Sequence, residues 1–353
     1  MDSELESYIE YRVAIGLWKG VAPCLLVLGG VGNILCIMIL TKKRSRGTST
    51  AIYLTALAIS DLLVLYTGLL RQWVKYQFEI DIRQLTEGGC KIHLFCVYFG
   101  TQCSSWFLVA VTAERFISAC FPHKVKMKCT QRTAGMVITV IIICLAILNV
   151  HWLYGIGNMY VVKMNITVLV KCESLFKPYE NFITYSWPWI DLCVFALLPC
   201  CLLIIGNIGI IINVVLSKKK SVTKVAPMQA MKRQAGNKTS HLTAMLLTIN
   251  FVFFLCVTPI SIYLIGETHW YANIETNDRM AESYMLWAIV NILMYTNHST
   301  NFLMYCLSGT RFRGEVKALF TGNGNKRGLF TNFKTTRTIQ VNDTINTVAE
   351  SVA

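Results

Sequence analysis

The sequence predicts an all-α membrane protein, a bundle of seven transmembrane helices with its N-terminus outside. Of the 353 residues, 54% are hydrophobic and only 15% are charged, which is too apolar for a water-soluble domain of this length. A helix that crosses a bilayer needs about 20 mostly apolar residues. Polar or turn-rich stretches separate such runs here, so we expect one membrane domain. The predicted spans cover residues 17–40, 50–72, 91–119, 133–155, 182–216, 242–266 and 283–306.

Lysine and arginine determine the predicted orientation. The loops after the first, third and fifth spans are basic and contain no Asp or Glu, whereas residues 1–16 carry Asp2, Glu4, Glu6 and Glu10. Positive loops stay in the cytosol, so we expect an extracellular tail (1–16) and a cytoplasmic C-terminus. The net charge of +14 then faces anionic lipid, and we do not expect nucleic acid as a partner.

Cysteine placement supports this topology. Of 14 cysteines, only Cys90 and Cys172 lie clearly outside, at the start of the third span and in the loop before the fifth. A disulfide between them would hold that loop over the bundle. The same loop contains "VVKMNITVLVK", whose alternating β-branched residues predict a short hairpin, and Asn165 begins a glycosylation motif on the outer side.

Polar residues inside the spans are candidates for function. Asp61 lies in the middle of the second span, where an ionised carboxylate costs roughly 2.5–3.5 kcal/mol on insertion scales, so it must meet partners or water. In the seventh span, "NHSTNFLMYC" predicts a polar helix face. Two interpretations stay open: interhelical hydrogen bonds that only hold the bundle together, or a switch. The residues at matching depth are Ser104, Asn33, Asn297 and Asn301, with His298 and Tyr305 on an adjoining face.

Several ordered motifs resemble those of the rhodopsin-like G-protein-coupled receptors over residues 17–320. They are "GNIL", "LAISD", "ERF", "FFLCVTP" and "NFLMY", with Cys90 placed 25 residues before Arg115 and Pro199 in the fifth span. The resemblance implies a receptor domain (17–306), an amphipathic membrane-surface helix (307–320) and a flexible cytoplasmic tail (321–353). It also implies signalling to a heterotrimeric G-protein by outward movement of the sixth helix, and arrestin as a partner of the threonine-rich tail.

The same resemblance assigns roles to individual residues. Asp61, Ser104, Asn297 and Asn301 would form a sodium and water pocket, which is the one cofactor implied. The coupling and switch residues would be Glu114, Arg115, Phe253, Pro259, Asn301 and Tyr305, although Glu114 and Arg115 alone would also fit a pair at the membrane interface. We expect bending at Pro259 with repacking of Phe253.

At several positions the sequence differs from the family pattern, and these differences affect the switch roles. The acidic latch for Arg115 near the sixth helix is missing, which predicts appreciable basal activity. The pattern is similar to invertebrate FMRFamide, myosuppressin and sex-peptide receptors, where Asn-Phe replaces Asn-Pro. The departing positions are Val257, Phe116 and Phe302, with Thr239 and His241 where the latch is expected.

The outer half of the bundle indicates a peptide ligand. The seventh span has no Lys for retinal, and Val97 stands where an amine receptor needs Asp. A carboxylate among aromatic rings, such as Asp191, suits the guanidinium of an Arg-Phe-amide-like peptide. Alternatively, Asp191 pairs with Arg71 or His93 within the protein. The predicted ligand-binding residues are Asp191, Arg71, His93, Tyr98, Trp187, Glu267, Trp287 and Tyr295.

Other classes of function fit less well. The chain has six His and no zinc-binding or serine-nucleophile motif, so we expect neither an enzyme nor a metal site. A transporter would commonly show internal repeats, and none is evident. The sequence leaves open a receptor for a non-peptide ligand and a non-signalling scaffold in the plasma membrane.

Overall fold

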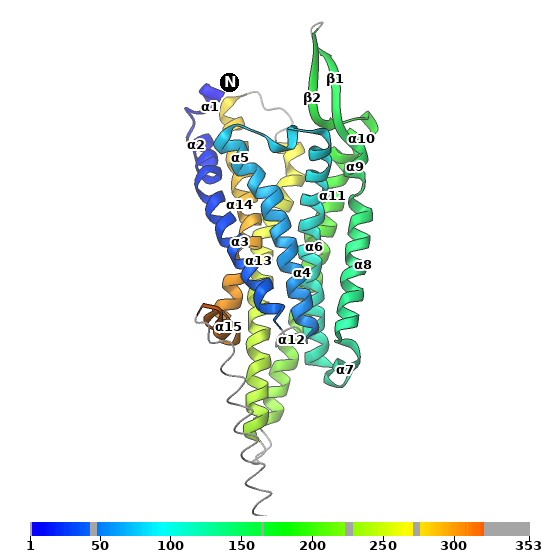
Figure 1. Cartoon of the computed structure of the whole chain (residues 1–353), viewed down its shortest axis with the longest axis vertical. Coiled ribbons are helices and arrows are strands. Elements are labelled where there is room, and N and C mark those ends of the chain that lie inside the picture. The colour runs from blue at the N-terminus through cyan, green and yellow to red at the C-terminus, as the bar shows by residue number, and fades with distance from the viewer. Residues whose placement is uncertain are drawn as a thin grey trace, which may run out of the picture. The chain divides into compact units, whose positions relative to one another are not determined.

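The computed structural model describes residues 2–42, 48–163, 166–222, 229–270, 276–308 and 310–320. Within residues 1–308, long helices lie side by side, and the N-terminus and a β-hairpin lie at the same end of this bundle (Figure 1). Six of the described helices are long and apolar enough to cross a membrane. The helix α14 (Asn277–Ser308) is also long enough, and its polar face accounts for its lower hydropathy. The predicted seven-helix membrane fold is confirmed.

Several spans are interrupted by π-helical turns, and short elements connect them. The first three spans comprise α2 (Ile9–Gly16) with α3 (Ala22–Leu40), α4 (Ser49–Val64) with α5 (Leu70–Phe78), and α6 (Glu87–Cys120). The next two comprise α8 (Gln131–Asn149) with α9 (His151–Gly155), and α10 (Lys177–Asn181) with α11 (Trp187–Asp191) and α12 (Leu198–Val222). The sixth is α13 (Gln229–Trp270). The π-helical turns are Leu17–Val21, Leu65–Leu69, Phe182–Ser186 and Leu192–Leu197, and the short elements are α1 (Asp2–Leu5), the 3-10 turns Ile82–Gln84 and Pro122–Lys124, and α7 (Val125–Lys128).

Threonine residues mark where three of the spans begin. Thr48, Thr86 and Thr130 have extended backbones, and each side-chain oxygen accepts a hydrogen bond from a backbone N–H in the first turn. Such caps satisfy donors that a helix start leaves unpaired and typically stabilise it by about 1 kcal/mol.

The predicted boundary of the first span at residue 17 is wrong. Helix α2 already begins at Ile9 and continues through a π-helical turn into α3. The extension is held by aromatic packing, because the ring of Tyr11 meets the ring of Tyr284 in α14 edge-on, with centroids 5.3 Å apart. The predicted N-terminal tail is therefore largely helical.

The loop before the fifth span forms the predicted hairpin. Strands β1 (Ile156–Lys163) and β2 (Ile166–Ser174) pair antiparallel. Cys90 and Cys172 form a disulfide across a sequence separation of 82 residues, which joins β2 to the start of α6. Both the hairpin and the disulfide are confirmed, whereas the glycosylation site at Asn165 lies outside the described residues.

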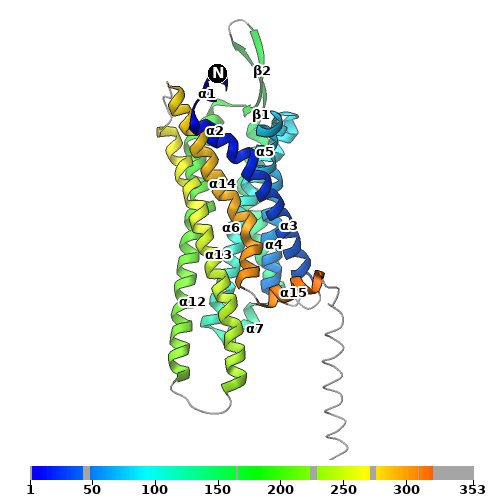
Figure 2. The same ribbon diagram turned by 90° about the vertical axis from the view of Figure 1, so that its left-hand side faces the viewer.

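Helix α14 packs between α3 and α13 (Figure 2). Glycines allow the close approach to α3: a Cβ at Gly29 would lie 2.9 Å from the Cα of Ser299, and one at Gly32 would lie 2.8 Å from the Cβ of Phe302. The phenylalanine that replaces the family's proline thus packs directly on a glycine. This contact places the polar face of α14 inside the bundle.

Residues after the seventh span form a separate unit. Its described part is the helix α15 (Thr310–Phe320), where the sequence predicts an amphipathic helix over 307–320. The predicted tail, 321–353, lies outside the described residues.

Candidate functional site

The carboxylate of Asp61 in α4 is the centre of a polar network. Its Oδ1 accepts hydrogen bonds from the Ser104 hydroxyl of α6 and from Nδ1 of His298 in α14, both at 2.7 Å. Its Oδ2 accepts one from the amide of Asn301, also at 2.7 Å. Asp61 and His298 are fully buried, so these donors replace water around the charge. The carboxylate therefore joins three helices.

The fourth residue of the predicted sodium pocket is Asn297, and the sequence predicts Asn33 at a similar depth and Tyr305 on an adjoining face. Asn297 is buried, but within the described part of the chain it makes no hydrogen bond to Asp61. Asn33 of α3 donates instead to the backbone carbonyl of His298 at 3.0 Å. Tyr305 is buried about two turns after His298 along α14. The network includes His298, which the predicted sodium pocket lacks.

A second cluster lies at the cytosolic end of α6. The Arg115 guanidinium donates to the hydroxyl of Thr50 in α4, and that hydroxyl donates to Oε1 of Glu114. Arg115 and Glu114 also lie 3.8 Å apart as an ion pair. The side chains of Thr239 and His241, where the usual latch would lie, are outside the described residues. Thr50 therefore links Arg115 and Glu114 of α6 to the neighbouring helix α4.

The amide of Asn250 links the sixth helix, α13, to two neighbouring helices. Asn250 donates to the Thr112 hydroxyl of α6 at 3.2 Å and to Oδ1 of Asn207 in α12 at 3.0 Å. Phe253 is buried one turn later, and Pro259 lies inside the helix, where it removes a backbone hydrogen bond. The predicted bending point, Pro259, therefore lies in the same helix as a side chain that bonds to two neighbouring helices.

The buried carboxylate of Asp191 has a partner that the sequence analysis does not predict. Gln102 of α6 donates to its Oδ1 at 2.9 Å, and the Gln102 carbonyl accepts from the amide of Asn149 in α8 at 2.6 Å. The alternative that Asp191 pairs with Arg71 or His93 is therefore wrong. The three polar groups form a chain across the third, fourth and fifth spans, and its burial makes Asp191 a poor first contact for a ligand.

Arg71 is paired with a loop residue instead. Its guanidinium donates to both oxygens of Asp81, at 2.7 and 2.5 Å, and Arg83 lies 4.0 Å from the same carboxylate. Burial works to raise the pKa of Asp81, but the hydrogen bond and charge of Arg71, with those of Arg83, outweigh it and bring this pKa to about 2. Asp81 therefore stays ionised at neutral and mildly acidic pH. His93 bonds through Nε2 to the Thr67 carbonyl at 3.1 Å.

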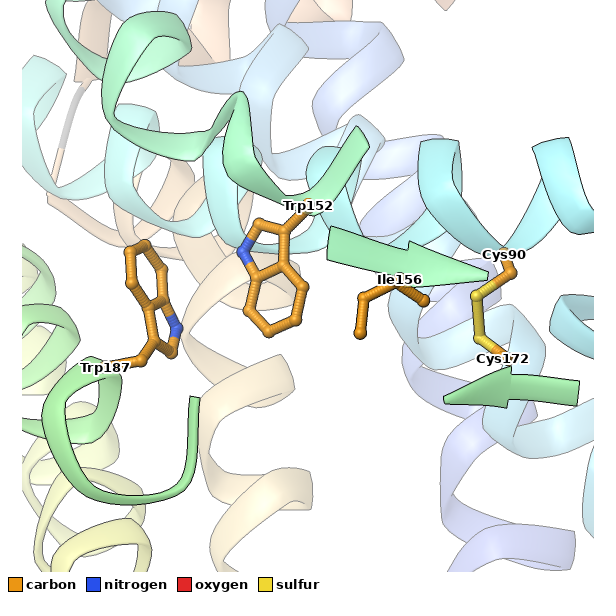
Figure 3. Close-up of a cluster of buried hydrophobic side chains, with 5 residues drawn as sticks. All are labelled: Cys90, Trp152, Ile156, Cys172 and Trp187. Carbon is orange, nitrogen blue, oxygen red and sulfur yellow. A yellow bond between two sulfur atoms is a disulfide. The ribbon is translucent and has the colours of Figure 1, made fainter. Parts of the chain in front are cut away.

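Two predicted ligand-binding aromatics lie in a packed core below the hairpin. Figure 3 shows Trp152 between Trp187 and Ile156, with the disulfide on the far side of Ile156. Tyr98 stacks on Trp152 with ring centroids 4.7 Å apart and meets Trp187 edge-on at 5.5 Å. Trp187 is only 2% exposed. These rings support the outer end of the bundle rather than lining an open pocket.

The remaining predicted ligand residues lie on the sixth and seventh spans. The Tyr263 hydroxyl donates to Oε1 of Glu267 at 3.3 Å, and the Tyr263 and Trp287 rings are 5.6 Å apart. Glu267 is half-buried, so its carboxylate can still be reached. Tyr295 is buried, and its hydroxyl approaches Gly68 closely. Trp287 is also half-buried, whereas Tyr263 is buried. Glu267 and Trp287 are thus the accessible carboxylate and aromatic ring of the predicted set.

Comparison with known proteins places the chain in a family. The model of the "7 transmembrane receptor (rhodopsin family)" matches residues 32–305. The chain belongs to this family. It is therefore a receptor and not an enzyme, and it is a multi-pass protein of the plasma membrane.

Individual relatives of this rhodopsin-family receptor are distant. Human C-C chemokine receptor type 1 is 27% identical over 298 residues, which cover 83% of this chain and 76% of the relative. The thyrotropin-releasing hormone receptor of Gallus gallus is 23% identical over 312 residues, and that of Bos taurus is 24% identical over 342 residues. The chicken alignment covers 83% of this chain and 75% of the relative, and the cattle alignment covers 90% and 82%.

Thr50→Val is expected to raise the receptor's basal signalling. Valine keeps the shape but removes the hydroxyl that joins Arg115 to Glu114. Losing a hydrogen bond of about 1 kcal/mol from the resting state would increase the active fraction about five-fold. Ligand-free signalling per receptor at the cell surface measures this. Thr55→Val is the control, because Thr55 bonds to the Ala51 carbonyl of its own helix; equal basal signals from the two variants would contradict the prediction.

Four residues of these polar networks, Gln102, Asn149, Thr50 and Asp81, are not predicted from the sequence. Gln102 and Asn149 lie deep in apolar spans, so the reasoning that singles out Asp61 could have found them. Thr50 has no such signal, because a threonine hydroxyl in a helix commonly bonds to its own backbone. Asp81 lies in a polar loop, where a carboxylate is unremarkable in sequence.

Proposed function

We propose that this receptor binds an extracellular peptide and transmits the binding to a heterotrimeric G-protein. The observation that carries this proposal is the closed inner end of the bundle, where Arg115 is held by Thr50 and α13 is held by Asn250. Relatives named for a chemokine and for thyrotropin-releasing hormone support a polypeptide messenger. Such a receptor needs a ligand contact at the outer end that shifts the bundle between two states.

The proposed movement is an outward swing of α13 about Pro259. It would break the bonds from Asn250 to Thr112 and Asn207 and would require Phe253 to repack. The Arg115 guanidinium would then leave Thr50 and face the opened space. There the G-protein would meet Arg115 and the basic stretch that connects the fifth and sixth spans. Its basic residues are Lys218, Lys219, Lys220, Lys224, Lys232, Arg233 and Lys238.

The ligand class that suits the outer end is an Arg-Phe-amide-like peptide. Its guanidinium would bind the carboxylate of Glu267, and its phenylalanine ring would lie against Trp287, which packs on the buried ring of Tyr263. Asp191 is less suited to this contact because its carboxylate is buried and already accepts a hydrogen bond from Gln102. The Asn-Phe variation of the seventh span is similar to that of receptors for such peptides.

Arrestin is a further proposed partner. Phosphorylated threonines in the tail would present the negative charge that basic docking surfaces recognise. Thr331, Thr335, Thr336 and Thr338 all lie outside the described residues.

Glu267→Gln tests the proposed ligand class. If an amidated Arg-Phe peptide activates the receptor, removing the charge should reduce its potency at least about ten-fold, since a hydrogen bond to a charged group contributes roughly 1.5–3 kcal/mol. Potency is measured as the half-maximal concentration in a cellular assay at matched surface expression. Glu282→Gln is the control, because Glu282 is exposed on α14. Equal potency on the wild type and Glu267→Gln would contradict the proposed contact, while leaving a peptide receptor intact.

A further inference from the structure

The family implies a sodium ion beside Asp61, and the residues around this carboxylate do not fit one. Hard cations are bound by oxygen atoms and need several of them. Both oxygens of Asp61 already accept hydrogen bonds, from Ser104, His298 and Asn301. The His298 imidazole, which is not part of the predicted sodium pocket, contains no oxygen. Its Nδ1 lies 2.7 Å from Oδ1 of Asp61.

Contacts with α3 also fix the His298 imidazole in its position beside Asp61. Asn33 donates to the backbone carbonyl of His298 at 3.0 Å, and Gly29 and Gly32 keep α3 close against this part of α14. The ring is fully buried, and its Nε2 has no hydrogen-bond partner among the described residues. Its contact with Asp61 is therefore the one described hydrogen bond of the ring, and turning away would leave both ring nitrogens unpaired in the interior.

We propose that His298 takes the place of the sodium ion, so that this receptor holds its resting state through a side chain rather than through a bound cation. The N–H of the ring directly contacts the carboxylate that a sodium ion would need. A receptor built in this way does not respond to sodium. Replacing the imidazole by a small hydroxyl should open space beside Asp61 and supply an oxygen, which would create a sodium site.

The test is the thermal unfolding of the purified receptor in NaCl and in KCl at equal ionic strength. Buried free thiols, among them Cys36, Cys103 and Cys256, allow a thiol-reactive dye to report the midpoint without any ligand. The wild-type midpoint should be the same in the two salts. In His298→Ser, the midpoint should be at least about 2 °C higher in NaCl, because a ligand that binds only the folded state stabilises it.

A wild-type midpoint that rises with NaCl but not with KCl would overturn the proposal. A response that is flat in both the wild type and His298→Ser would overturn the role given to the imidazole. Adding Asp61→Asn to His298→Ser should remove the gained sodium response. If His298→Ser does not fold, His298→Asn provides the second variant, because its amide also offers an oxygen. The experiment needs no peptide and no G-protein, so its result is independent of the proposed function.

Discussion

Cys172→Ser should remove most of the receptor from the cell surface. The disulfide joins β2 to the start of α6 across 82 residues, and it lies in the core that contains Trp152 and Trp187. Loss of a native disulfide typically costs 2–5 kcal/mol, roughly half of a domain's stability at the upper end. Surface labelling of an epitope-tagged receptor, together with total expression, measures the loss.

The matched control is Cys201→Ser. Cys201 is a free cysteine whose side chain is exposed on the bundle, so its replacement should leave surface expression near the wild-type level. If Cys172→Ser reaches the surface as well as Cys201→Ser does, the disulfide does not hold the outer end of the fold.

Trp187→Ala should destabilise the receptor by about 3–5 kcal/mol, the range for removing a buried aromatic side chain. Trp187 is 2% exposed and packs edge-on against Tyr98 and Trp152. The thermal unfolding midpoint of the purified receptor measures the effect.

Trp189→Ala provides a close control because Trp189 lies on the same short helix, α11, and is 55% exposed. It should lower the midpoint far less than Trp187→Ala does. Equal midpoints would mean that the Trp187 ring is not part of a packed core, and its predicted role in binding a ligand would then regain support.

The sequence predicts the bundle well because hydropathy and loop charge act over whole spans. It also indicates the network around Asp61, since a carboxylate in an apolar helix must find donors wherever they lie. The start of the first helix is less predictable, because Glu10 and Arg12 interrupt the apolar run and the helix here depends on packing such as that of Tyr11 on Tyr284.

Partners of single side chains are harder to predict. The sequence shows that Asp191 needs a partner, but whether Gln102 or Arg71 supplies it depends on helix rotation and depth. The two threonines Thr50 and Thr55 look alike in sequence, and only the folded bundle distinguishes a link between helices from a bond within one. Such differences arise from tertiary geometry, which local pattern does not encode.

The most direct test of the receptor's proposed function is a cellular calcium assay with a promiscuous G-protein, in which the wild type and Arg115→Ala are challenged with a pool of amidated neuropeptides. Arg115 lies at the cytosolic end of α6, bound to Thr50, and is the residue proposed to meet the G-protein. The account predicts a response from the wild type that Arg115→Ala loses at equal surface expression. Silence of the surface-expressed wild type, or an undiminished response from Arg115→Ala, would contradict it.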